Sequence, residues 1–141
     1  MNFVQDQSSA AQWITSVCTG AFILGAAGLL KGKRATTHWG YTHLLGEYGA
    51  THEEARVVRD GNLITAGGVT SGIDFSLQVI AAIAGDDVAQ SIQLALEYDP
   101  DPPFAGGHPV RTPDHIVSRL RERIYDAAAA RMAQAIADCR T

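Results

Sequence analysis

A cysteine in the stretch "WITSVCTG" is the residue of this sequence best suited to covalent chemistry. The β-branched run that ends at Val17 predicts a buried strand, and the segment from Thr19 onwards predicts a helix. Cys18 then lies at a strand-to-helix turn, where the partial positive charge of the helix N-terminus favours a thiolate. The Thr19 N–H could stabilise an anion formed by attack, and Gly20 permits the tight turn. A small buried cysteine that closes an apolar strand explains the same residue types equally well.

A histidine ends the next expected strand, in "TTHW". The C-terminal ends of parallel strands share one edge of a sheet, so His38 could face the same crevice as Cys18. The alternative is a histidine whose ring is satisfied by the backbone of a strand-end loop. Either way, His38 and the adjacent Trp39 are candidate pocket residues.

A glycine-rich run, "TAGGVTSGID" (65–74), lies between an expected strand and an expected helix. It matches neither the dinucleotide-binding fingerprint nor the P-loop, but its amides could line a pocket for a small ligand. Asp74 is interpreted as an acid in the first helical turn rather than as a catalytic base. His43 and His52 are expected at the surface, and His108 and His115 show no metal-ligand spacing. We therefore predict no metal ion and no cofactor.

Strands that alternate with helices must position these residues, which predicts an α/β fold. The hairpin signal around Asp60-Gly61-Asn62 is the clearest local feature. The patterns predict strands at 13–17 and 34–37, and helices at 19–30, 40–49, 69–83 and 86–98.

The C-terminal part combines a loop and a long helix. Residues 98–112 are rich in proline and glycine and predict a loop. The following segment, 113–140, predicts one helix, because apolar residues recur every four positions and should dock on the body or on a partner. These residues are Ile116, Leu120, Ile124, Ala128, Met132 and Ile136.

Composition narrows the possible classes of function. The 141 residues suit a single domain over 1–141, with 46% hydrophobic residues and a net charge of −4. No clustered basic face points to nucleic acid, and the longest apolar run, at 21–30, is too short for a membrane span. The two cysteines form no metal-type spacing, and the N-terminus lacks a signal-peptide pattern. We expect a cytoplasmic protein that binds neither nucleic acid nor membrane.

Several stretches together resemble the ThiJ/PfpI superfamily, and more narrowly its isocyanide hydratase subgroup, over residues 2–137. They are "ITSVCTGAFILGAAGLLKGKRATTHW", "ARVVRDGNLITAGGVTSGIDFSL", "IQLALEYDP" and "DPPFAGGHP". The resemblance implies a flavodoxin-like three-layer sandwich with a mostly parallel sheet, in a homodimer that acts on a small molecule. It implies hydration of isocyanides to N-substituted formamides, with no cofactor.

The resemblance also assigns roles to individual positions. Cys18 matches the nucleophile, and Thr19 matches the residue whose N–H stabilises the anion. His38 matches a histidine near the cysteine in related proteins. The pocket would be completed by Trp39, Gly68, Val69 and Thr70.

The match implies a domain truncated at its N-terminus. Family members carry a preceding segment that supplies further strands, an acidic residue that contacts the cysteine, and a glycine-rich loop with a second N–H donor. No position of this sequence matches them. Two alternatives stay open: another cysteine hydrolase or hydratase of glyoxalase or amidase type, and the amidase-like ligand- or redox-sensing domain of AraC-type regulators.

Overall fold

Five strands form two small sheets in the computed structural model, which describes residues 2–139. The larger sheet has the order β1 (Ile14–Val17), β5 (Leu63–Ala66), β4 (Val57–Asp60). β1 runs parallel to β5, with Ile14 opposite Leu63, and β4 runs antiparallel to β5. The smaller sheet pairs β2 (Arg34–Ala35) in parallel with β3 (Thr51–His52).

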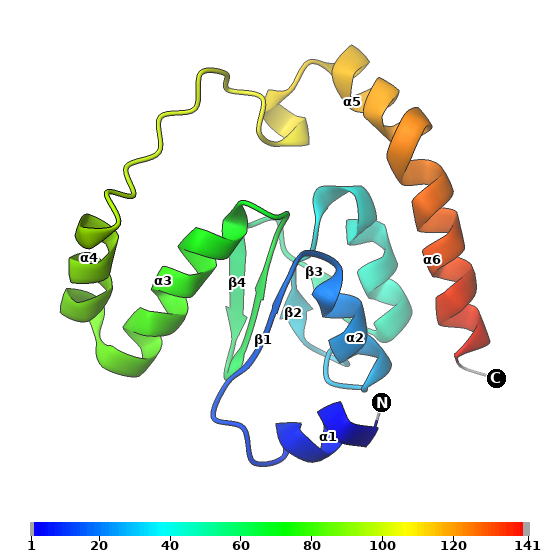
Figure 1. Cartoon of the computed structure of the whole chain (residues 1–141). Helices are drawn as coiled ribbons and strands as arrows, with labels where there is room; N and C mark the ends of the chain where they lie inside the picture. Colours follow the sequence, from blue (N-terminus) through cyan, green and yellow to red (C-terminus); the bar gives the residue numbers. More distant parts are fainter. Residues whose placement is uncertain (1, 140–141) are drawn as a thin grey trace.

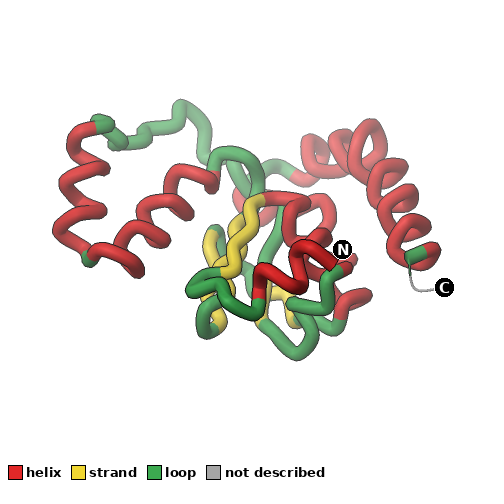
Figure 2. The backbone as a smooth tube through the Cα atoms, turned by 60° about the horizontal axis from the view of Figure 1, so that its bottom comes forward, coloured by secondary structure: helices red, strands yellow, loops and turns green. Residues whose placement is uncertain are grey.

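Helices flank these strands on both sides. They are α1 (Asn2–Ser8), η1 (Cys18–Gly20), α2 (Ala21–Ala26), η2 (Trp39–Tyr48), α3 (Ser71–Ala84), α4 (Asp86–Ala95), η3 (Pro109–Arg111), α5 (Asp114–Leu120), η4 (Arg121–Tyr125) and α6 (Asp126–Asp138). α3 packs against the three-stranded sheet and carries α4 on its outer side, whereas α2 and η2 pack together on the other side, where α6 joins them (Figure 1, Figure 2). The predicted three-layer α/β class is confirmed, with the β4–β5 hairpin as the antiparallel element.

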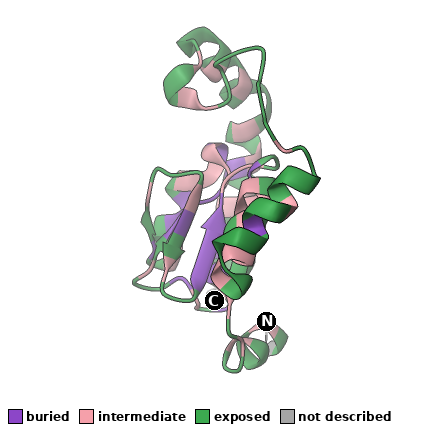
Figure 3. Cartoon of the chain, turned by 90° about the vertical axis from the view of Figure 1, so that its left-hand side faces the viewer, coloured by how far each residue is buried: buried purple, intermediate pink, exposed green. Residues whose placement is uncertain are grey.

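The core is centred on β5 and on the helices opposite α3. All four residues of β5 are buried, which is why its sequence shows no alternation of apolar and polar side chains. Leu30 and Leu45 are fully buried and belong to the same hydrophobic cluster as Leu63 of β5. Buried residues concentrate in the strands and their covering layer, while α4 and the long loop that follows it are largely exposed (Figure 3).

The hairpin is confirmed, and Gly61 takes a positive φ of +66° in its turn. The helix expected at 19–30 is shorter than predicted, because the chain turns at Gly28 with a φ of +77°. The strand expected at 34–37 comprises only Arg34 and Ala35, which pair with β3. It ends there because the amide of Thr36 donates to the side-chain hydroxyl of Thr65 and not to a neighbouring strand. The helix expected at 40–49 is confirmed as the 3₁₀ helix η2.

The terminal helix is broken by the π turn η4 between α5 and α6. The expected apolar face does not dock on the body in its first half, where Ile116 and Ile124 are exposed. A strict spacing of four residues drifts by about 40° per step around a helix of 3.6 residues per turn, and the π turn adds a further shift. The helix docks through Tyr125 and Ala129, which lie off the predicted face, and through Met132 and Ile136, which belong to it. Position 140, the end of the predicted helix, lies outside the described residues.

Over residues 2–139, every helix is too short or too polar to cross a membrane. The assignment of residues 1–141 to one domain stays a prediction.

Candidate active site

Cys18 lies at the point where β1 turns into η1, as the sequence predicts. Its φ is +57°, in the left-handed region that residues other than glycine seldom occupy. The Cys18 N–H donates to the Gly67 carbonyl at 2.9 Å, and the Thr37 hydroxyl donates to the Cys18 carbonyl at 2.7 Å. Cys18 is half-buried and has a free thiol, so a sharp strand-to-helix turn holds a cysteine that is partly open to reagents.

Thr19 follows as the second residue of η1, and η1 leads directly into α2. A residue in this position can present its N–H to an anion at the preceding side chain. The role of Thr19 therefore stays a prediction that this geometry permits.

His38 comes immediately before η2 and is half-buried. Its Nδ1 accepts a hydrogen bond from the Gly40 N–H at 3.2 Å, so the neutral ring carries its proton on Nε2. Burial lowers the pKa of His38 from its ordinary 6.5. A Cβ atom on Gly68 would lie 2.8 Å from His38 Cδ2, so the glycine allows the ring to approach the β5–α3 loop.

Aromatic rings surround the other side of His38. The Tyr125 ring centroid lies 5.0 Å from that of His38 and 4.6 Å from that of Trp39. Tyr41 completes the group at 5.8 Å from Tyr125. A Cβ atom on Gly40 would lie 2.8 Å from Tyr125 Cδ1, so only glycine leaves room for this ring. The π turn thereby anchors the terminal helix beside His38.

One cleft of about 670 Å³ collects most of the predicted pocket residues. Its walls include His38, Trp39, Gly68, Val69 and Thr70. Cys18 and Thr19 are not among its lining residues, but the Cys18 backbone is hydrogen-bonded to two residues that are, Thr37 and Gly67.

Basic side chains stand around the same cleft. Arg56 is paired with Asp74 and also donates to the Thr70 hydroxyl at 3.3 Å. Arg121 lies over the Trp39 ring, with the guanidinium carbon 5.5 Å from the ring centroid. Asp74 belongs to the first turn of α3, as expected, and also accepts a hydrogen bond from Tyr98. Asp74 thus acts as a structural partner of Arg56 and Tyr98 at the edge of the cleft.

Comparison with known proteins identifies the family. The sequence model of the DJ-1/PfpI family matches residues 1–82, more than half of the chain. The chain belongs to the DJ-1/PfpI family. The predicted resemblance to the ThiJ/PfpI superfamily and its isocyanide hydratase subgroup is thereby confirmed.

Individual relatives of this DJ-1/PfpI chain cover it to different extents. It is 53% identical to the isonitrile hydratase of Pseudomonas putida over 123 residues, which are 87% of this chain and 54% of that protein. A ThiJ/PfpI family protein from Pseudomonas syringae superposes with a TM-score of 0.89 at 46% identity, over 96% of this chain and 55% of the other. The HTH-type transcriptional regulator GlxA of Rhizobium meliloti is 36% identical over 81 residues, 56% of this chain and 25% of the regulator. The chain thus spans about half the length of the isonitrile hydratase and of the solved structure.

Sequence reasoning missed several residues of this DJ-1/PfpI site. His52 is exposed, as expected, but it lines the cleft, and His108 and Arg111 line it from η3. No local sequence pattern predicts that these residues share a cleft. They come together only because the long loop after α4 brings η3 back over the ends of the strands. Thr37 stands next to His38 in "TTHW", yet its contact with Cys18 depends on how β2 lies against β5.

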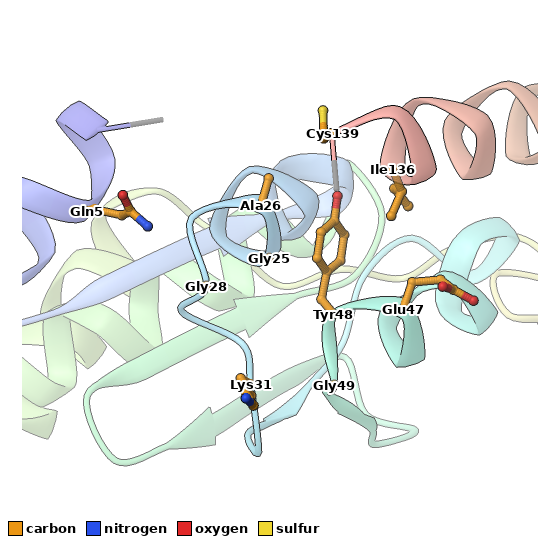
Figure 4. Close-up of a pocket in the computed structure, with 10 residues that line it drawn as sticks. All are labelled: Gln5, Gly25, Ala26, Gly28, Lys31, Glu47, Tyr48, Gly49, Ile136 and Cys139. Atoms are coloured by element: carbon orange, nitrogen blue, oxygen red, sulfur yellow. The ribbon is translucent and has the colours of Figure 1, made fainter. Parts of the chain in front are cut away.

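A second cleft, of about 420 Å³, does not have Cys18 among its lining residues, which Figure 4 shows. It is formed by α1, α2, η2 and the end of α6, and it shares no lining residue with the first cleft. The other cysteine of the chain, Cys139, lies at its rim and is exposed. No group of three or more His, Cys, Asp or Glu side chains within residues 2–139 could hold a metal ion.

Proposed function

We propose that this chain carries the nucleophilic half of an isocyanide hydratase and converts isocyanides to N-substituted formamides. The observation that supports this function best is the 53% identity to an isonitrile hydratase over a segment that contains Cys18 in a strained strand-to-helix turn. The cleft beside that turn has room for a small organic molecule. A homodimer stays a prediction.

The reaction begins with the Cys18 thiolate, a soft nucleophile suited to a soft neutral electrophile. The thiolate attacks the terminal carbon of R–N≡C, and one proton adds to that carbon, which gives a thioimidate, R–N=CH–S–Cys18. Water then adds to the same carbon. Collapse breaks the C–S bond and releases R–NH–CHO and the thiol, so the cysteine is regenerated.

The surrounding residues stabilise the developing charge and contact the substrate. The Thr19 N–H stabilises negative charge as it develops, and Trp39, Val69 and Thr70 contact the R group. The proton donor matches no position of this sequence, so attack and turnover must be measured separately.

Intact-mass spectrometry after incubation with an aryl isocyanide tests the attack, and chromatography of the aryl formamide tests turnover. We expect the wild-type chain to gain the mass of one isocyanide, and Cys18→Ala and Cys18→Ser to gain none and to form no formamide above the blank. Cys139→Ser is the matched control, because it removes the other free thiol and should behave as wild type. An adduct on Cys18→Ala, or undiminished formamide from Cys18→Ser, would contradict the mechanism.

The similarity to the transcriptional regulator GlxA supports a second candidate function, a ligand- or redox-sensing domain. In that case peroxide would oxidise the Cys18 thiolate to sulfenic acid with release of water, and no isocyanide would be consumed. Trapping of Cys18 sulfenic acid by a dimedone probe, together with the absence of any isocyanide adduct, would favour this function.

A further inference from the structure

The strained backbone of Cys18 needs restraint from outside its own turn. Within residues 2–139, Cys18 and Glu97 are the non-glycine residues with positive φ. Glu97 lies in an exposed turn after α4, a common place for this conformation. Cys18 instead lies between a strand and a helix, and such a conformation persists only where neighbouring structure imposes it.

Two hydrogen bonds from separate segments restrain Cys18 on both sides of its Cα. Its N–H is held by the Gly67 carbonyl, after β5, and its carbonyl is held by the Thr37 hydroxyl, after β2. The Ala21 N–H also points to the Cys18 carbonyl, but this contact is internal to the turn. The Thr37 hydroxyl is therefore the side-chain group that ties the carbonyl side to the rest of the fold.

Thr37 is itself fixed by the strands beneath it. It is 2% exposed, and the amide of the preceding Thr36 donates to the buried Thr65 hydroxyl at 2.8 Å. The Ala35 carbonyl accepts from the Glu53 N–H at 3.0 Å. β5 thus holds both tethers, because Gly67 directly follows it and Thr65 fixes the segment that carries Thr37.

We infer that Thr37 is a positioning residue for the nucleophile: its hydroxyl holds Cys18 in the left-handed conformation and so sets where the thiol lies. The inference rests on the proposed role of Cys18. If the tether is lost, the backbone of Cys18 relaxes, the Cα–Cβ bond turns with it, and the position of the sulfur changes. A displacement of this kind slows attack although the thiol itself is retained.

The test compares Thr37→Val, which keeps the shape and loses the hydroxyl, with Thr37→Ser, which keeps the hydroxyl. Thr15→Val is the matched control, because Thr15 is an exposed residue of the strand that leads to Cys18. The first readout is the rate of Cys18 alkylation by iodoacetamide at one pH, measured by peptide mass spectrometry with Cys139 as the internal reference. The second readout is the rate of isocyanide adduct formation, and thermal unfolding by circular dichroism identifies folded variants.

We expect Thr37→Val to slow Cys18 alkylation and adduct formation about three- to tenfold relative to Cys139 alkylation, the range that the loss of one hydrogen bond allows. Thr37→Ser should restore most of both rates, and Thr15→Val should change neither. Equal Cys18 rates in wild type, Thr37→Val and Thr37→Ser would overturn the inference, as would a Thr37→Ser chain that folds but reacts as slowly as Thr37→Val. If alkylation follows the expected order while no variant or wild type forms an isocyanide adduct, Thr37 keeps its positioning role and the proposed function is wrong.

Discussion

The cleft has two walls that differ in how firmly they are held. On one side, the lining residues Thr36 and Thr37 are buried beside the buried strand β5, and the Thr37 hydroxyl holds the Cys18 carbonyl. On the other side, no residue of 99–120 is buried, although η3 from this segment lines the cleft. The predicted nucleophile is thus held by the buried wall, while the exposed wall has few packing constraints.

Stability should depend far more on the first wall than on the second. Ile64→Ala, in β5, should lower the free energy of unfolding by about 3 kcal/mol, because it leaves a cavity in the core. Ile116→Ala makes the same chemical change in α5, where the side chain is 40% exposed, and should cost less than about 1 kcal/mol. Urea unfolding followed by circular dichroism measures both. Similar losses in the two variants would show that the exposed wall is as firmly packed as the strands.

Gly40 of η2 contacts Tyr125 of η4, and this contact attaches the terminal helix to the body of the protein. Gly40→Ala would place a Cβ atom 2.8 Å from the tyrosine ring, so we expect a loss of about 1–3 kcal/mol as the ring is displaced. Gly72→Ala is the matched control, because nothing lies within 4 Å of its new Cβ and alanine favours the helix. Thermal unfolding gives the stability of each variant, and tryptophan fluorescence follows Trp39 beside the ring. An unchanged melting temperature in Gly40→Ala would mean that the terminal helix is not anchored here.

The smallest expected effect is the change in stability with pH that is due to His38, a residue that lines the cleft immediately before η2. Burial lowers its pKa, so between that lowered value and 6.5 the unfolded chain binds a proton that the folded chain does not. The contribution of the neutral His38 ring to the free energy of unfolding is therefore complete above pH 6.5, and it is lost as the pH falls through the lowered pKa. Nitrogen-detected NMR should show that more than half of the His38 rings are neutral at pH 6.5 and that the neutral ring carries its proton on Nε2. Tyr125→Leu, which admits water to the ring, should raise the pKa of His38 towards 6.5; a pKa at or above 6.5 in the wild type would contradict this account.

The two walls also differ in how well the sequence predicts them. The hairpin, the strand before Cys18 and the position of Cys18 at a turn follow from local patterns, because each depends on neighbours in the chain. The tether from Thr37 depends on how β2 lies against β5, which no local pattern encodes.

The terminal helix shows the limit of periodicity. Its apolar spacing correctly predicts a helix, and Met132 and Ile136 of the predicted face pack on the core. Ile116 and Ile124 of that face are exposed, because a π turn changes the phase where the helix reaches the body. Tyr125 gave no signal of its own, since its partners Trp39 and Gly40 lie far away in the sequence. The catalytic role of Cys18 and the pocket roles of its neighbours remain predictions.

The pairing of β1 with β5 has a consequence for the order of assembly. The β4–β5 hairpin closes through a tight turn, whereas β1 reaches β5 only after the whole intervening chain has been brought into place. Cys18 follows β1 directly, and its two tethers come from segments on either side of that hairpin. We therefore expect the left-handed turn to form late in folding, so that the reactivity of its thiol reports completed tertiary packing rather than the presence of strands and helices.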